Sequence, residues 1–214
     1  MTAQVETAPQ AAPEPTVLTK LLTVWLVALL AIVSYLSVGH LTVGYAHGGG
    51  SGMAIDRWIP FLPWTVWIYL PMYALVFHVA VFFVRTRHTL NRTIYSLLIT
   101  WAISYSIFAI WPLSGPRVPP TNEDTWTMWM MGALQAVDPP NNTFPSLHVA
   151  DLLCVSLGCY RDDRTGGAGL LALSLFPMMA TVTTKQHYAA DLVGGIVVAV
   201  FSHWVTFRAT RLTA

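Results

Sequence analysis

The stretch Thr184-Lys185-Gln186-His187-Tyr188-Ala189-Ala190-Asp191 leads directly into the apolar run Leu192–Phe207. It holds a histidine and a carboxylate four residues apart, where a polar loop gives way to a segment long enough to form a helix. Residues four apart on a helix lie on one face, one turn from each other. The spacing therefore predicts that Asp191 holds the ring of His187 at the mouth of a helix.

A second histidine stands in the same kind of place. His148 lies in Phe144-Pro145-Ser146-Leu147-His148, at the start of another apolar run. The proline just ahead of Ser146 suits a helix start, where free backbone amides and a hydroxyl can receive an anion. Asp151 follows three residues after His148, so it either tunes that histidine or pairs with another helix. Two histidines, a carboxylate and a hydroxyl at two helix ends can carry out phosphoryl or acyl transfer.

The composition is that of a membrane protein. Hydrophobic residues make up 55% of the 214 residues and charged residues only 10%, against about 25% charged in a soluble domain. Six apolar runs approach the length of a bilayer span, about 17–25 residues: Val17–Gly39, Trp64–Val84, Ile94–Trp111, Ser146–Tyr160, Gly169–Thr184 and Ala189–Phe207. We therefore predict an all-α fold, a six-helix transmembrane bundle that forms one catalytic domain over residues 17–211.

Three segments outside these runs have their own character. Residues 1–16 are rich in Ala, Pro, Thr and Glu, cannot bury apolar surface, and are predicted to form a disordered N-terminal tail. The glycine-rich segment His40–Gly52 is not followed by Lys-Ser/Thr, so it predicts a surface loop rather than a phosphate-binding loop. Asp124–Val137 predicts a helix lying in the membrane interface, either as an anchor or as a lid over a lipid site.

The Lys and Arg residues predict the orientation in the membrane. With both termini in the cytoplasm, the inner side carries eight of the 11 basic residues: Lys20, Arg85, Arg87, Arg92, Arg161, Arg164, Arg208 and Arg211. The outer side then carries only Arg57, Arg117 and Lys185. The positive-inside rule favours this topology. It also gathers the candidate residues at the extracytoplasmic surface, although no motif entered the count: Arg117, Ser146, His148, Lys185, His187 and Asp191.

Arg117 lies in the segment Trp111–Pro120, which contains four prolines and a glycine. These residues make the segment stiff and extended, able to hold an arginine over the helix ends. The rigid guanidinium fork matches phosphate oxygens, so we predict that Arg117 is a phosphate ligand. The net charge is +1 and the basic residues do not cluster. The predicted partner is therefore membrane lipid and not nucleic acid.

These motifs resemble those of the type 2 phosphatidic acid phosphatase superfamily. Phe144–His148 is similar to its second signature, and His187–Asp191 followed by Gly194-Gly195 is similar to its third. Within that superfamily, the block Asp56–Tyr69 and the His-Tyr pair resemble the inositol phosphorylceramide synthase branch. The resemblance extends roughly from Asp56 to Gly195, with the motifs in matching order and spacing.

The resemblance implies a six-helix membrane enzyme that acts on a lipid phosphoester and needs no metal or other cofactor. In such an enzyme His187 would attack phosphorus and become a phosphohistidine. Asp191 would orient the attacking ring, and His148 would protonate the leaving alkoxide. The phosphoryl oxygens would be held by Ser146 and Arg117.

The chain departs from the phosphatase pattern in its cations. That pattern has a lysine before the first-signature arginine and an arginine ahead of the third-signature histidine. Here Ser104–Pro116 holds no lysine and Thr181 stands six residues before His187, although Lys185 could supply one lost charge. A phosphomonoester carries close to two negative charges, so fewer cations favour a phosphodiester donor, with an alcohol such as inositol, a lipid hydroxyl or water as acceptor. The alternative is a phosphatase of phosphatidic acid or of a polyprenyl phosphate.

Two other classes of protein could use the same side chains. A metal enzyme could use two histidines and two carboxylates as ligands: His148, Asp151, His187 and Asp191. Membrane di-iron enzymes need more clustered histidines than the seven scattered along this chain. A transporter could use histidine and aspartate as a proton relay, but that hypothesis leaves Arg117 and the Pro-Ser-Leu-His turn unexplained.

Overall fold

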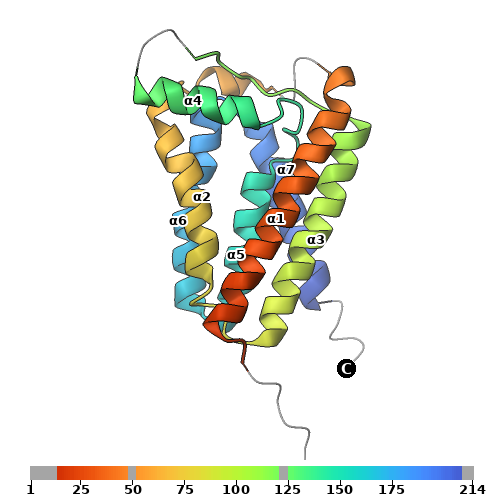
Figure 1. The fold of residues 1–214 in the computed structure, drawn as a ribbon, viewed down its shortest axis with the longest axis vertical. Helices are drawn as coiled ribbons and strands as arrows, with labels where there is room; N and C mark the ends of the chain where they lie inside the picture. Colours follow the sequence, from red (N-terminus) through yellow and green to blue (C-terminus); the bar gives the residue numbers. More distant parts are fainter. Residues whose placement is uncertain (1–13, 48–51, 121–124, 209–214) are drawn as a thin grey trace, which may run out of the picture.

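The computed structural model describes residues 14–47, 52–120 and 125–208 (Figure 1). Within these ranges the fold is all-α, as predicted, with seven α-helices and no strand: α1 (Val17–Thr42), α2 (Val66–Ala80), α3 (Arg87–Ile110), α4 (Trp126–Val137), α5 (Leu147–Asp162), α6 (Arg164–Thr183) and α7 (Ala189–Arg208). Short 3₁₀ turns flank α1 and α2 at Val43–Tyr45, Ala54–Arg57 and Pro63–Thr65. The predicted N-terminal tail lies almost entirely outside the described residues, and so does most of the Gly48–Gly52 run.

The predicted count of six helices is not the count observed. Four helices in the described part of the chain are long and apolar enough to cross a membrane: α1 with its 3₁₀ extension, α3, α6 and α7. Two predicted spans are shorter, with 15 residues in α2 and 16 in α5. A 3₁₀ turn that begins at Pro63 precedes α2, and Asp163 ends α5 by capping α6, accepting a hydrogen bond from the Gly166 amide. The seventh helix is α4, the segment predicted to lie in the interface, and its N-cap is Thr125.

The bundle is built around α5. Helices α2, α3, α6 and α7 all pack against it, and Val149, Ala150, Leu152 and Cys154 are completely buried. Helix α1 is peripheral, because side chains such as Trp25 and Leu26 remain more than half exposed. Apolar side chains facing outward from a helix this long are what a lipid environment requires. Figure 1 shows α4 lying across the end of the bundle at which α5 and α7 begin.

Helix α7 touches the start of α5 without intervening side chains. A Cβ atom at Gly195 would lie 2.5 Å from the carbonyl oxygen of Ser146 and 3.0 Å from Cβ of Val149. One turn earlier, the Ser146 amide donates a hydrogen bond of 3.0 Å to the carbonyl of Asp191. Small residues at a helix crossing allow this close approach. The two sequence motifs, 41 residues apart at Ser146 and His187, therefore meet at one end of the bundle.

Candidate active site

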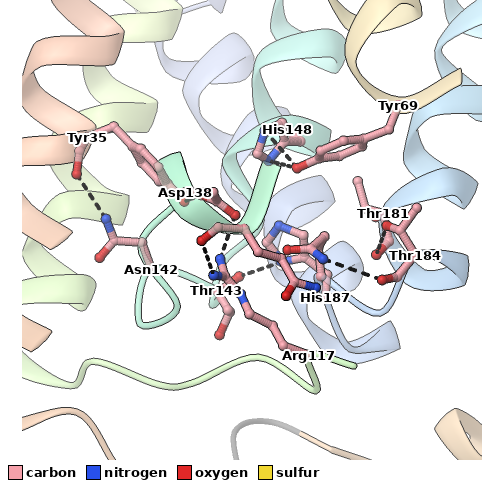
Figure 2. A network of polar contacts seen from close by, with 12 residues as sticks. Tyr35, Tyr69, Arg117, Asp138, Asn142, Thr143, His148, Thr181, Thr184 and His187 are labelled. Atoms are coloured by element: carbon pink, nitrogen blue, oxygen red, sulfur yellow. Dashed lines mark hydrogen bonds and ion pairs between the residues drawn. The ribbon is translucent and has the colours of Figure 1, made fainter. Parts of the chain in front are cut away.

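His187 lies in the turn between α6 and α7, and its side chain is buried. Its Nδ1 is 3.1 Å from the carbonyl oxygen of Thr143 (Figure 2) and 3.3 Å from Oδ2 of Asp191. Both neighbours are acceptors, so Nδ1 carries the proton and donates it to them. The lone pair is then on Nε2, which lies 3.4 Å from Oγ of Ser146. The turn thus presents Nε2 of the imidazole toward α5.

Backbone hydrogen bonds and two carboxylates hold this turn in shape. The amide of His187 donates to the carbonyl of Thr181 at 3.1 Å. Oδ2 of Asp191 accepts from the Tyr188 amide at 2.9 Å, and Oδ1 of Asp56 accepts from the Ala189 amide at 2.8 Å. Negative charge at the first turn of a helix is favourable because the free amides there carry partial positive charge. The start of α7 is therefore fixed independently of any substrate.

His148 occupies the first turn of α5 and faces the same space. The centroid of its ring is 5.7 Å from that of His187, at an angle of 67°. The hydroxyl of Tyr69 lies 2.9 Å from its Nε2 and 3.1 Å from its Nδ1. The ring of Tyr73 packs edge-on at 5.1 Å. Two tyrosines of α2 thus hold His148 beside His187.

Asp151 sits one turn deeper on α5 and is bonded across the bundle. Its carboxylate accepts from Nε1 of Trp101 on α3 at 2.9 Å and from the hydroxyl of Tyr73 on α2 at 3.0 Å. Both donors are neutral, and a buried carboxylate needs such partners. These contacts pair Asp151 with α2 and α3, and the ring of Tyr73 also packs against His148.

Arg117 is largely buried and already bonded to protein groups. Its Nη2 lies 2.7 Å from Oδ2 of Asp138, and its Nη1 donates to the carbonyl of Gln135 at 3.3 Å. The Tyr35 hydroxyl donates to the other oxygen of Asp138 at 2.5 Å (Figure 2). Burial raises the pKa of Asp138 above its ordinary value, although the nearby Arg117 and His187 oppose that rise. Arg117 is therefore one half of an ion pair.

The order of these elements can be compared with known families. A family model of the PAP2 superfamily matches residues 53–205, which include both histidines, Arg117 and Asp191. The chain belongs to the PAP2 superfamily. The match confirms the superfamily predicted from the motifs. It does not distinguish the inositol phosphorylceramide synthase branch from other members. No curated protein and no solved structure matches the chain.

Lys185, predicted as a second cation of the site, is also bonded to protein groups. Lys185 has a backbone φ of 57°, and its ammonium donates to the carbonyls of Ile59 at 2.6 Å and Asp56 at 3.3 Å. It thereby ties the segment before α2 to the turn that bears His187. Thr181 is buried and contributes its backbone carbonyl to that turn. Neither residue directs a positive charge at His187 in these contacts.

Two cavities adjoin the site. One of about 520 Å³ is lined by His187 and its neighbours Lys185 and Tyr188, together with Met53 and Arg57. The other, about 470 Å³, has an entirely apolar side-chain lining from four parts of the chain: Met53, Ile107, Phe144, Pro145, Ala190, Val193, Val197 and Val198, with Gly194 among them. Met53 borders both cavities. A cavity lined by both charged and apolar residues beside an entirely apolar one suits an amphiphilic molecule.

The side chains considered as metal ligands do not assemble into a metal site. Among residues 14–47, 52–120 and 125–208, no three His, Cys, Asp or Glu side chains are grouped closely enough to hold a metal ion. Asp151 is turned toward Trp101 and Tyr73 rather than toward the two histidines.

Several residues of the site escaped the sequence interpretation. Asp56 and Asp138 were given no role, although both are among only 10 acidic residues and both fall on the predicted outer side. Acidic residues are rare in so apolar a chain, so their position at that surface could have marked both as candidates for the site. Tyr35 and Tyr73 carried no such signal, because tyrosine is common in membrane helices near the interface.

Proposed function

We propose that the protein is an integral-membrane lipid phosphotransferase that works through a phosphohistidine at His187. Membership in the PAP2 superfamily supports a lipid enzyme of the phosphatase or phosphotransferase type. The observation that carries the proposal is the orientation of the His187 ring. With Nδ1 donating to Thr143 and Asp191, the lone pair of Nε2 faces Ser146 and the ring of His148. This is the arrangement that a nucleophilic histidine needs.

In the first half of the proposed reaction, Nε2 of His187 attacks phosphorus in line with the leaving alkoxide. The N–P bond forms as the P–O bond breaks, and protonated His148 gives its proton to the leaving oxygen. Asp191 stabilises the positive charge that develops on the His187 ring. The phosphoryl oxygens receive hydrogen bonds from Ser146 and Arg117.

The second half reverses these roles. An acceptor hydroxyl loses its proton to His148 and attacks the phosphohistidine, which breaks the N–P bond and restores neutral His187. The acceptor is an alcohol in the transferase we propose. Water is the acceptor in the second candidate, a lipid phosphate phosphatase, and the polar cavity beside His187 supports it because water can enter there.

The engaged cations support a phosphodiester donor, as in an inositol phosphorylceramide synthase-like enzyme. Arg117 is paired with Asp138, and Lys185 is bonded to two backbone carbonyls. Thr181 occupies the position at which the phosphatase pattern has an arginine. A site with little uncompensated positive charge is better matched to one negative charge than to two.

We propose that six of the seven helices cross the membrane as a bundle. Helices α2 and α5 cross the membrane with α1, α3, α6 and α7, and residues 17–211 form one catalytic domain. The packing of α5 against α2, α3, α6 and α7 supports this. The end covered by α4 faces the extracytoplasmic side, a proposal that rests on the Lys and Arg distribution.

The function is tested by competitive turnover with purified protein. The donors are phosphatidic acid, a polyprenyl phosphate and phosphatidylinositol, the last offered with ceramide or diacylglycerol as acceptor. We expect transfer of the phosphoryl headgroup from phosphatidylinositol to exceed phosphate release from either monoester. The His187→Ala variant serves as the blank. Efficient phosphate release with no headgroup transfer would establish the phosphatase instead.

The orientation is tested with single cysteines at opposite ends of the bundle. A side chain at Gly44 would meet no other atom within 4 Å, and Thr165 is exposed. Both native cysteines, Cys154 and Cys159, are buried, so background labelling is low. We expect an impermeant maleimide to label Gly44→Cys in intact cells and to label Thr165→Cys only after permeabilisation. The reverse pattern would invert the topology.

A further inference from the structure

Asp138 is a largely buried carboxylate to which the phosphotransfer chemistry assigns no role. It follows α4 directly and is held from two sides, by Nη2 of Arg117 at 2.7 Å and by the hydroxyl of Tyr35 at 2.5 Å. The side chains of Asp138 and Arg117 are only 13% and 16% exposed. Figure 2 shows Asp138 and Arg117 in the same group of side chains as His148 and His187.

The ion pair with Asp138 balances the positive charge of Arg117 but leaves some of its N–H donors unused. A guanidinium has five N–H donors. Asp138 and the carbonyl of Gln135 engage Nη2 and Nη1, and Nε is buried with no partner. The guanidinium therefore keeps N–H donors that no protein group uses, while its positive charge is balanced by a fixed carboxylate.

The position of the Asp138 carboxylate is fixed by its bonded neighbours. Tyr35 belongs to α1, and its backbone carbonyl also accepts from Nδ2 of Asn142 at 3.0 Å, so the residue is anchored on the loop that leads to Ser146. Moving Asp138 away from Arg117 would leave a buried charge without its partner, which is costly. The pair therefore persists when substrate binds.

We propose that Asp138 is a specificity-determining residue that, by balancing the charge of Arg117, makes the site accept a phosphate with one negative charge and reject one with two. The proposal rests on the proposed phosphotransfer at His187 and names the residue that sets its donor class. The second charge of a phosphomonoester meets the Asp138 carboxylate in a poorly screened environment, where like charges repel strongly.

Binding of two small anions tests the proposal without turnover. Methyl phosphate carries two charges at about pH 8, because its second pKa is near 6, and dimethyl phosphate carries one. By calorimetry, we expect the wild-type protein to bind dimethyl phosphate at least as tightly as methyl phosphate. In Asp138→Asn, and in Asp138→Ala as a second neutral variant, the ratio of affinities should move about tenfold toward methyl phosphate.

Tyr35→Phe is the matched control, because it removes a hydrogen bond from Asp138 and keeps the charge. Its ratio of affinities should stay at the wild-type value. A tenfold wild-type preference for methyl phosphate, an unchanged ratio in Asp138→Asn, or binding of neither anion to the wild type would overturn the proposal. Because these ratios need no chemistry at His187, they remain decisive if turnover assays contradict the phosphohistidine.

Discussion

His187→Ala is expected to reduce turnover of any lipid phosphoester to background, a loss of about 10⁴-fold or more. The substitution removes Nε2, the ring nitrogen that faces Ser146. Among the contacts of the described residues, no other nitrogen of this turn faces Ser146 with a lone pair. No neighbouring side chain can take its place, because the His148 ring is held by Tyr69 and Tyr73. Initial rates with the best donor provide the measurement.

Rapid quenching with a labelled donor should trap a phosphoenzyme on the wild-type protein alone. A phosphohistidine is labile to acid and stable to base, which distinguishes it from a phosphoserine at Ser146. His88→Ala is the control, because His88 is exposed at the opposite end of the bundle, at the start of α3. Retained activity in His187→Ala, or a trapped phosphoenzyme in that variant, would contradict the assignment of the nucleophile.

His148→Ala is expected to lose about 10²–10⁴-fold in rate with a natural lipid donor, the contribution typical of a general acid. An alkoxide is a poor leaving group, so its departure requires the proton that His148 supplies. A donor with a nitrophenolate leaving group needs no such proton. The variant should therefore form the phosphoenzyme from that donor at a rate close to that of the wild type.

The comparison between the two donors separates acid catalysis from simple damage to the site. The His148 ring packs against Tyr73 and His187, so truncation to alanine also removes contacts. Lost packing would slow both donors equally, whereas loss of the acid would slow only the alkyl donor. Equal losses with the two donors would rule out His148 as the acid that protonates the leaving group.

Local spacing accounts for what could be predicted. The hydrophobic runs indicate helices because a membrane helix needs a continuous apolar segment, whatever its neighbours are. The spacing of His187 and Asp191 predicted their pairing, and the structure has the two side chains 3.3 Å apart, although His187 lies in the turn just before α7 rather than on the helix. The order of the Phe144–His148 and His187–Asp191 motifs was enough to identify the superfamily.

The number of helices was less predictable than their existence. The sequence of an apolar run does not show which of its residues will form a 3₁₀ turn instead of an α-helix, as Pro63–Thr65 do. Nor does it show which residue will end the helix as a cap, as Asp163 does. Those choices depend on hydrogen bonds made at the ends of the run. Thr183, for example, accepts from the amide of Leu62 at 2.8 Å, which joins the end of α6 to the segment before α2.

By itself, then, the sequence determined the helical membrane class and the His187–Asp191 pair, because each depends on residues close together in the chain, and the superfamily, because the motifs are short and their order can be read along the chain. Only the tertiary structure decided that Arg117 pairs with Asp138, that Tyr69 holds His148 and that Asp138 receives the hydroxyl of Tyr35, which lies 103 residues away. The physical reason is helix packing. Which side chains face each other across the bundle depends on close approaches such as that of Gly195 to Ser146, and no local spacing encodes them.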